Sequence, residues 1–286
     1  MPIKKILVPV RGDGKGEGVL DHALALAKRS NAHIDVIHAR APASEFLSQS
    51  VMVTQSMRRS VRELAEREAD DHERRVRKLF TDYCETHNLE VAESAAEAAG
   101  RVTVDWRERR GSQASVVGLW GRLADLIAVA QPSKDRTLGH NTLEAALFQA
   151  GKLVLVCPPK PVGATICEHM AVAWDGSTES ARVVSAALPL LQHAKAVSIL
   201  QVSDGSPELS AQALVEYLAW WGVPADVHEF PHKHTIGRDL YTNAKAIGGD
   251  VMLMGAYGHS RSREIILGGA TREVIENTDI PVLMQK

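Results

Sequence analysis

The feature that most constrains the fold is an internal repeat of three segments, which recur in the same order. The first half of the chain contains "IKKILVPVRGDG" (3–14), "GRLADLIAVAQP" (121–132) and "GKLVLVCPPK" (151–160). The second half contains "EHMAVAWDGSTE" (168–179), "IGGDVMLMGAYG" (247–258) and "DIPVLMQK" (279–286). The repeat predicts a duplicated domain. Three prolines and a glycine break regular structure between the copies, which places the domains at 1–160 and 161–286.

Within each copy, apolar runs alternate with helical patterns. The second half has apolar runs at 170–174, 197–202, 250–254 and 281–284, a further expected strand at about 225–230, and helical spacing between them. Runs without polar alternation indicate a parallel sheet that is buried on both faces. Strand–helix alternation then predicts a doubly wound α/β domain in each half.

The first half differs by an insertion at about 45–100, between its expected second strand (33–38) and third strand (102–109). Most of the insertion is a highly charged helix, 56–88, with one apolar stripe that includes Val61, Leu64, Val76, Leu79, Phe80 and Tyr83. This stripe has two interpretations. The helix packs on its own domain, which we favour, or it serves self-association or a protein partner.

Composition excludes several classes of protein. The 33 Lys and Arg residues against 35 Asp and Glu residues give a net charge of −2, which argues against nucleic acid or an anionic membrane as the main partner. No stretch approaches the 18 or so uncharged apolar residues of a membrane span. Three cysteines without metal-ligand spacing favour a reduced, cytoplasmic protein.

A glycine-rich stretch, 255–271, follows the apolar run that ends at residue 254. Gly255 and Gly258 are expected to form turns that let a ligand approach the main chain, and Gly268 and Gly269 precede a helix expected from about Ala270. The N-terminus of that helix suits an anion. Thr271 offers a hydroxyl group, while His259, Arg261 and Arg263 offer charged partners. The alternative is a tight turn with glycines present for steric reasons alone.

The spacing Gly255-x-x-Gly258, nine residues, then Gly268 resembles the nucleotide loop of the universal stress protein family. The resemblance covers almost the whole chain as two tandem copies, and it implies the adenine-nucleotide α-hydrolase-like fold of that family. It also implies that the last strands, 152–157 and 281–285, pair across a pseudo-twofold axis.

In nucleotide-binding members of this family, ATP lies across the strand ends. By resemblance, Asp175 lies near the nucleoside, Val202 lines the adenine pocket, and the glycines and the following hydroxyl residues hold the phosphates. The predicted contacts in this chain are Asp175, Val202, Gly255, Gly258, His259, Arg261, Gly268, Gly269, Ala270 and Thr271. The chain departs from the family at Gly269, where a Ser or Thr is expected.

The first copy departs much further from the family pattern. Arg11 replaces the Asp after the first strand, and the segment 130–146 lacks the glycine turn, so that only Gly139 remains near the distal glycine pair. We therefore expect the first half to be a scaffold without nucleotide.

Two pairs of residues in the second half are also candidates for a functional or structural role. His232 and His234 have a spacing that could bind zinc, but no third ligand is evident, and an exposed loop is the preferred interpretation. Trp220 and Trp221 are expected in the core or between the halves.

The sequence thus predicts a cytoplasmic universal stress protein, a binding or regulatory module that holds ATP, with or without Mg²⁺, in its second domain. Its partners would be an adenine nucleotide and a protein partner or a second copy of the chain. The alternatives are a nucleotide-free interaction protein of the same fold and a slow ATP hydrolase. No catalytic residue or resident metal ligand stands out.

Overall fold

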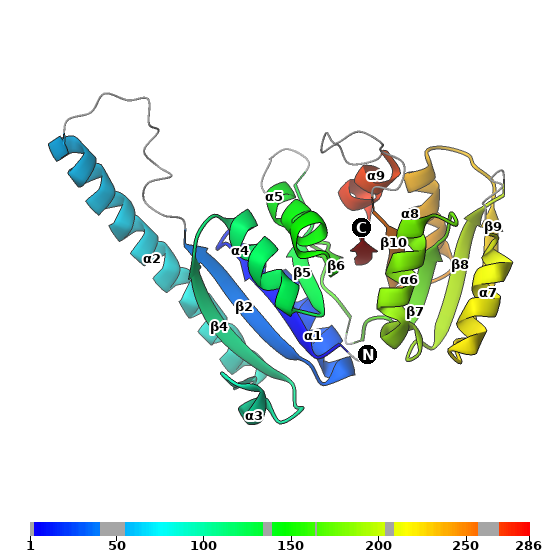
Figure 1. Cartoon of the computed structure of the whole chain (residues 1–286), viewed down its shortest axis with the longest axis horizontal. Coiled ribbons are helices and arrows are strands. Elements are labelled where there is room, and N and C mark those ends of the chain that lie inside the picture. The colour runs from blue at the N-terminus through cyan, green and yellow to red at the C-terminus, as the bar shows by residue number, and fades with distance from the viewer. Residues whose placement is uncertain (1–2, 41–54, 134–138, 164, 204–208, 257–268) are drawn as a thin grey trace.

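The computed structural model describes residues 3–40, 55–133, 139–163, 165–203, 209–256 and 269–286, and all structural statements below refer to these ranges. Strands and helices alternate along the chain, as the apolar runs predict (Figure 1). The elements of the first half are β1 (Lys5–Val10), α1 (Gly16–Ser30), β2 (His33–Arg40), α2 (Gln55–His87), β3 (Glu90–Val91), α3 (Ala95–Ala98), β4 (Thr103–Arg110), α4 (Gln113–Trp120), a 3₁₀ turn (Gly121–Leu123), β5 (Leu126–Ala130), α5 (His140–Glu144), a π-helical turn (Ala145–Ala150) and β6 (Leu153–Cys157).

The second half repeats this plan without the insertion. Its elements are β7 (His169–Ala173), α6 (Thr178–Leu191), β8 (Ala196–Val202), α7 (Ala211–Trp220), β9 (Asp226–Phe230), α8 (Ile236–Ala246), β10 (Val251–Gly255), α9 (Gly269–Asn277) and β11 (Val282–Gln285). The expected strands and helices are all present, and their boundaries differ by a few residues.

The described strands form one sheet in the order β3-β4-β2-β1-β5-β6-β11-β10-β7-β8-β9. Strands pair in parallel within each half, and β6 pairs antiparallel with β11, with Leu155 opposite Leu283. The predicted pairing of the two last strands is therefore confirmed. Of the two edges of this sheet, β3 has two residues and β9 carries Asp226 and Glu229, features that discourage pairing with other chains.

Helices cover both faces of the sheet, which makes each half a three-layer unit. One core contains α1, the C-terminal half of α2, α6 and α7 with the strand residues facing them. The other core contains α4, α5, α8 and α9. No helix within the described ranges is both long and apolar enough to cross a bilayer.

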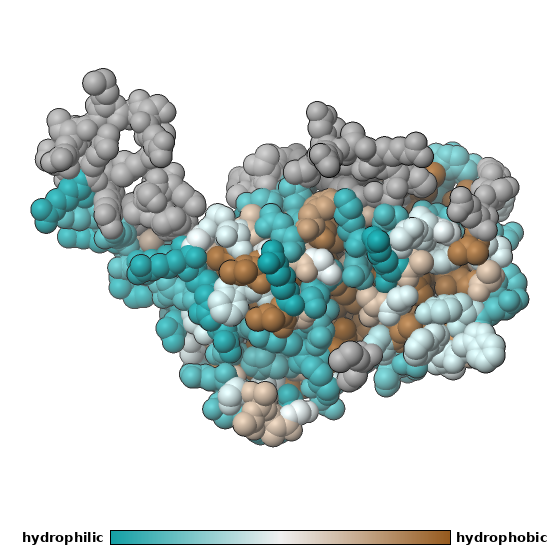
Figure 2. All heavy atoms as spheres, viewed as in Figure 1, coloured by the Kyte–Doolittle hydropathy of each residue, from teal (hydrophilic) through white to brown (hydrophobic). Residues whose placement is uncertain are grey.

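The inserted helix α2 lies across its own domain only through its C-terminal half. Val76, Phe80, Tyr83 and Cys84 are buried there, whereas Leu79 and Leu64 are 58% and 59% exposed. Nearer the middle of the helix, Arg40 of β2 pairs with Asp70 and Glu73. The N-terminal part of α2 projects from the body of the molecule, with a mainly hydrophilic surface (Figures 1 and 2). Packing on the same domain is thus confirmed for residues 76–84 and wrong for Leu64 and Leu79.

The prediction for the two tryptophans is also wrong. Trp220 and Trp221 end α7 and are 89% and 48% exposed. Helix α7 packs beside β8 and β9, and β9 is the edge strand of the sheet that the described residues form.

Candidate functional site

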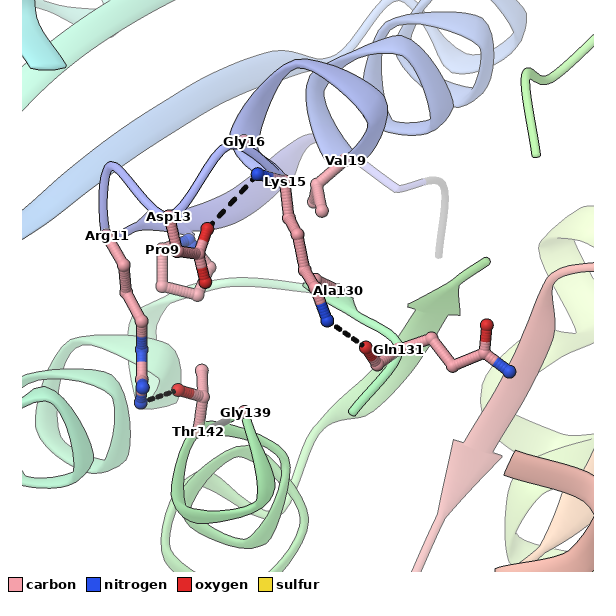
Figure 3. A pocket seen from close by; sticks show the side chains of 10 residues that line it. All are labelled: Pro9, Arg11, Asp13, Lys15, Gly16, Val19, Ala130, Gln131, Gly139 and Thr142. Carbon is pink, nitrogen blue, oxygen red and sulfur yellow. Dashed lines mark hydrogen bonds between the residues drawn. The ribbon is translucent and has the colours of Figure 1, made fainter. Parts of the chain in front are cut away.

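In an open parallel sheet, ligands bind at the carboxyl ends of the strands where the strand order reverses. In the first half, this place lies between the ends of β1 and β5. A crevice there is lined by residues of the β1–α1 loop, the end of β5 and the start of α5 (Figure 3). The space that remains free in it is small, about 30 Å³.

Two cations of the β1–α1 loop fill this crevice. The guanidinium group of Arg11 donates hydrogen bonds to the side-chain oxygens of Asn141 and Thr142 at the start of α5. The ammonium group of Lys15 donates to the carbonyl oxygen of Gln131 at 3.0 Å (Figure 3). It also donates to Oγ of Ser133 at 2.8 Å. The space that could hold a ligand's polar groups is therefore bridged by side chains of the protein itself.

Gly139 remains in this half for a structural reason. Its φ is +101°, and a Cβ there would lie 3.3 Å from the backbone of Pro132. Gly139 thus precedes α5 and lies close to Pro132, the residue that occupies the position of Gly258 in the second copy.

The second half differs at the residue equivalent to Arg11. Asp175 follows β7 and is exposed, and its Oδ1 accepts hydrogen bonds from the backbone N–H of Ser177 at 3.0 Å and from its hydroxyl group at 2.6 Å. Ser177 in turn caps the N-terminus of α6. Val202 ends β8, is half-buried and packs against the core formed with α8 and α9. The two residues predicted beside the nucleoside therefore lie at the carboxyl ends of adjacent strands.

The predicted glycine loop is described only at its two ends, and Gly258, His259, Arg261 and Gly268 lie outside the described residues. The turn expected at Gly255 is wrong, because Gly255 is the last residue of β10. A Cβ there would lie 2.7 Å from the backbone nitrogen of Ser180 and 2.8 Å from the carbonyl carbon of Glu179. Gly255 is thus required by the close approach of α6.

The distal end of the loop agrees with the helix predicted from about Ala270, since α9 begins at Gly269. A Cβ at Gly269 would meet no atom of the described residues within 4 Å, so the described surroundings do not demand glycine there. Ala270 is half-buried and Thr271 is 5% exposed. The side chain of Thr271 is therefore enclosed, and what the first turn of α9 exposes is the backbone around Gly269.

The start of α8 packs against the start of α9. A Cβ at Gly237 would lie 2.7 Å from the carbonyl oxygen of Ala270, so the two helix N-termini lie side by side. In the first turn of α8, Asp239 accepts hydrogen bonds from residues of the segment before the helix: from Nδ1 of His232 and of His234, each at 3.1 Å, and from the backbone N–H groups of Lys233 and His234.

This arrangement explains the two histidines without a metal. Although burial acts to raise the pKa of Asp239, the hydrogen bonds from His234, Lys233 and His232 hold it well below its ordinary value. Both imidazoles are substantially exposed, as expected, and among the described residues no group of three His, Cys, Asp or Glu side chains could hold a metal ion.

The structure thus brings Asp175 and Val202 to neighbouring strand ends, and Gly269, Ala270 and Thr271 into the first turn of one helix. What sequence reasoning missed is the way the first crevice is closed. The exchange of Asp for Arg11 was visible in the sequence, but its partners Asn141 and Thr142 lie 130 residues away and carry no motif.

Comparisons with known proteins fit this architecture. Residues 2–135 match the model of the universal stress protein family. A 34-residue segment is 53% identical to the universal stress protein Slr1230 of Synechocystis, and the match spans 12% of this chain and 12% of that protein.

Solved structures of such proteins share the fold over nearly the whole chain. A universal stress protein from Archaeoglobus fulgidus superposes with a TM-score of 0.71 at 16% identity, over 99% of this chain and 96% of that one. A universal stress protein from Pseudomonas aeruginosa, described as putative in its own record, superposes with a TM-score of 0.54 at 15% identity, over 99% and 93% of the two chains. These likenesses show the fold alone.

Proposed function

We propose that the chain, whose residues 2–135 match the universal stress protein family model, is a cytoplasmic regulatory member of that family that binds ATP in its second half. In this proposal the domains are 1–160, a closed copy that carries the inserted helix, and 161–286, the nucleotide-binding copy. The reduced state of the cytoplasm is consistent with Cys84, Cys157 and Cys167, which are free and buried.

The observation that carries the proposal is the contrast between the two strand-end sites. In the first half, Arg11 and Lys15 bridge the crevice to its opposite wall. In the second half, the equivalent position is the exposed carboxylate of Asp175, and α9 presents its N-terminus at the end of the glycine loop. A helix N-terminus attracts phosphate through its N–H groups and its dipole, and a carboxylate suits ribose hydroxyls or a phosphate-bound Mg²⁺.

The burial of the possible donors determines which contacts with the nucleotide we assign. Because Thr271 is enclosed, we assign phosphate binding to backbone N–H groups at the start of α9 and to Gly258 and Gly268, rather than to a threonine hydroxyl. His259 and Arg261 are assigned to the phosphate charge, Val202 to the base and Asp175 to the sugar. ATP would act as a regulatory ligand, because a partner protein can distinguish the ATP-bound chain from the free chain. This role needs no catalytic step.

The test is titration calorimetry of the full chain with Mg-ATP and with AMP. We expect ATP to bind at least as tightly as AMP, because the loop is suited to phosphates. Gly258→Val should abolish binding, since a β-branched residue is excluded from the turn that we assign there. Lys15→Met, which alters the first crevice, is the matched control and should leave ATP binding unchanged. Loss of binding in Lys15→Met with retention in Gly258→Val would place the site in the first half.

A second candidate function is a nucleotide-free interaction protein, which the exposed aromatic end of α7 favours. Tyr217, Trp220 and Trp221 are 39%, 89% and 48% exposed, an unusual concentration of aromatic surface. Absence of heat and of any thermal shift with millimolar Mg-ATP would favour this role. Release of inorganic phosphate from bound ATP would instead indicate the slow hydrolase.

A further inference from the structure

The middle of helix α2 packs against the β1–α1 loop at Gly12. Gly12 has a φ of +73°, and a Cβ there would lie 2.5 Å from Val76 and 2.8 Å from His72 of α2. Nε2 of His72 also donates a hydrogen bond of 2.8 Å to the carbonyl oxygen of Arg11. We call residues 70–76 of α2 the contact segment. Its close approach to the loop depends on a glycine and on one imidazole.

A second imidazole, that of His38 in β2, lies under the contact segment and is 4% exposed. Its ring centroid is 5.7 Å from that of His72, and it also stacks on Trp106 at 5.8 Å. Its Nδ1 donates a hydrogen bond of 3.2 Å to the carbonyl oxygen of Val10. The two imidazoles thus bind neighbouring carbonyl groups of one loop. If the contact segment moved away, His38 would become accessible to water.

The charged groups around these imidazoles come from α2, β2 and β4. Arg40 of β2 pairs with Asp70 and Glu73 of the contact segment, and its Nη1 lies 3.6 Å from Oε1 of Glu108 in β4. The charged side chains of the loop line the crevice of Figure 3 instead, namely Arg11, Asp13 and Lys15. A proton on His38 would therefore lie beside His72 and near carboxylates that Arg40 already binds.

We propose that His38 and His72 form a pH-sensitive switch, in which protonation of His38 releases the contact segment of α2 from the β1–α1 loop while the rest of the chain stays folded. The proton would place a charge in the buried layer between α2 and the sheet, which is costly without water. Release of the contact segment returns His38 to water and removes this cost. The released part of α2 should then fray, because a short helix without packing is only marginally stable.

The direction of the switch follows from the titration of His38. Burial is the main cause that lowers the pKa of His38 while the contact segment is docked, and the charges of His72 and Arg40 act in the same direction. In water, His38 would have its ordinary pKa of about 6.5. The released state therefore binds more protons, so docking is stable above about pH 6.5 and weakens as the pH falls below it.

Glu73 opposes this effect. Its hydrogen bond with Glu108 raises its pKa, so a proton on Glu73 favours the docked state. For this reason the experiment must compare variants in which Glu73 is retained and only a histidine is changed.

The experiment is hydrogen–deuterium exchange of the full chain at pH 7.5, 6.5 and 5.5, with the rates corrected for the intrinsic effect of pH. We expect the protection of amides 70–76 to fall by up to about tenfold between pH 6.5 and 5.5, which is the limit for one proton taken up on release. The amides of α6 (Thr178–Leu191) report on global unfolding and should stay better protected than the contact segment at each pH.

His38→Phe removes the titratable group but keeps an aromatic ring against Trp106, and it should make the protection of amides 70–76 independent of pH. His33→Gln is the matched control. Burial lowers the pKa of His33 as well, but this residue of β2 points to the opposite face of the sheet and contacts Thr103. It should retain the response of the parent chain. Should His38→Phe fail to fold, His38→Gln takes its place.

Gly12→Ala tests the docking contact itself. The added Cβ would collide with Val76, so the contact segment should lose protection already at pH 7.5. The proposal is overturned if the protection of amides 70–76 in the parent chain does not depend on pH, or if the variant at position 38 keeps the full response. Equal protection of amides 70–76 and of α6 would also overturn it, because release would then be global unfolding.

Discussion

Nε2 of Gln131 lies 3.1 Å from the carbonyl oxygen of Thr278, so a residue at the end of β5 donates a hydrogen bond to the segment after α9 in the other half. The same nitrogen also contacts the carbonyl oxygen of Ile275, near the C-terminus of α9. In the sequence alignment of the two copies, Gln131 occupies the place of a residue in the glycine loop. In the first half, the residue at this loop position thus binds the second half of the chain.

Replacement of Gln131 by Ala should lower the free energy of unfolding by about 1–2 kcal/mol, because two carbonyl oxygens lose a donor at the junction. Urea denaturation followed by circular dichroism measures this change. Gln212→Ala, on the exposed face of α7, is the control and should alter stability by less than about 0.5 kcal/mol. Equal effects of the two substitutions would show that the contact of Gln131 has no energetic role.

Gly255→Ala should destabilise the protein, whereas Gly269→Ala should not. The added Cβ at 255 meets the backbone of α6 at 2.7 Å, which neither element can relieve without moving, and we expect a loss of about 1–3 kcal/mol. The added Cβ at 269 meets no atom of the described residues within 4 Å, and alanine at the start of α9 should be neutral or stabilise by up to about 1 kcal/mol.

The measurement for this pair is thermal unfolding with and without Mg-ATP. If Gly255→Ala were as stable as the parent while losing ATP, glycine at 255 would be needed by the ligand rather than by α6.

Phe80→Ala should lower the free energy of unfolding by about 3–5 kcal/mol, because it removes a buried ring between α2 and Trp106. Leu64→Ala on the same helix removes a side chain that is 59% exposed and should change stability little. Light scattering of both variants separates packing from association. A smaller species produced by Leu64→Ala would show that the exposed part of the stripe joins two chains.

Stability should fall as the pH is lowered from 7.5 to 5.5. Burial lowers the pKa of His38 below its ordinary value, and burial lowers the pKa of His22 and His33 as well. The unfolded chain takes up these protons near pH 6.5 whereas the folded chain does not, so protonation favours unfolding below that pH.

His38→Phe tests this effect and should make the dependence of stability on pH shallower. His193→Gln, at an exposed position, is the control and should leave that dependence unchanged. Glu73 acts in the opposite direction, because its hydrogen bond with Glu108 raises its pKa. The comparison must therefore be made between variants. A parallel pH profile for His38→Phe and the parent would rule out His38 as a contributor.

The fold could be predicted well from the sequence, because local apolar runs indicate the strands and the repetition of these runs indicates the two domains. The runs at 170–174 and 250–254 correspond to β7 and β10. The pairing of the last strands was implied by the resemblance to the universal stress protein family, and the structure has it. The exposure of Trp220 could not be foreseen, because it depends on where the sheet ends rather than on the residues near it.

The candidate site was only partly predictable for a similar reason. The helix that begins at Gly269 followed from local glycine and helix signals. The role of Gly255 did not, since the helix that touches it starts more than 70 residues earlier in the chain. Likewise, the close approach of Gly12 to Val76 and His72 arises because the inserted helix lies over a loop from the beginning of the sequence.

The pairing of β6 with β11 within a single chain also affects how the molecule responds to dilution. Two separate subunits joined along such strands would come apart at low concentration, whereas here the partners are covalently tethered and their encounter is a first-order process. The midpoint of unfolding should therefore be independent of protein concentration. The tether also fixes a one-to-one stoichiometry between a copy with a closed crevice and a copy with an exposed aspartate, an asymmetry that no exchange of subunits can average out.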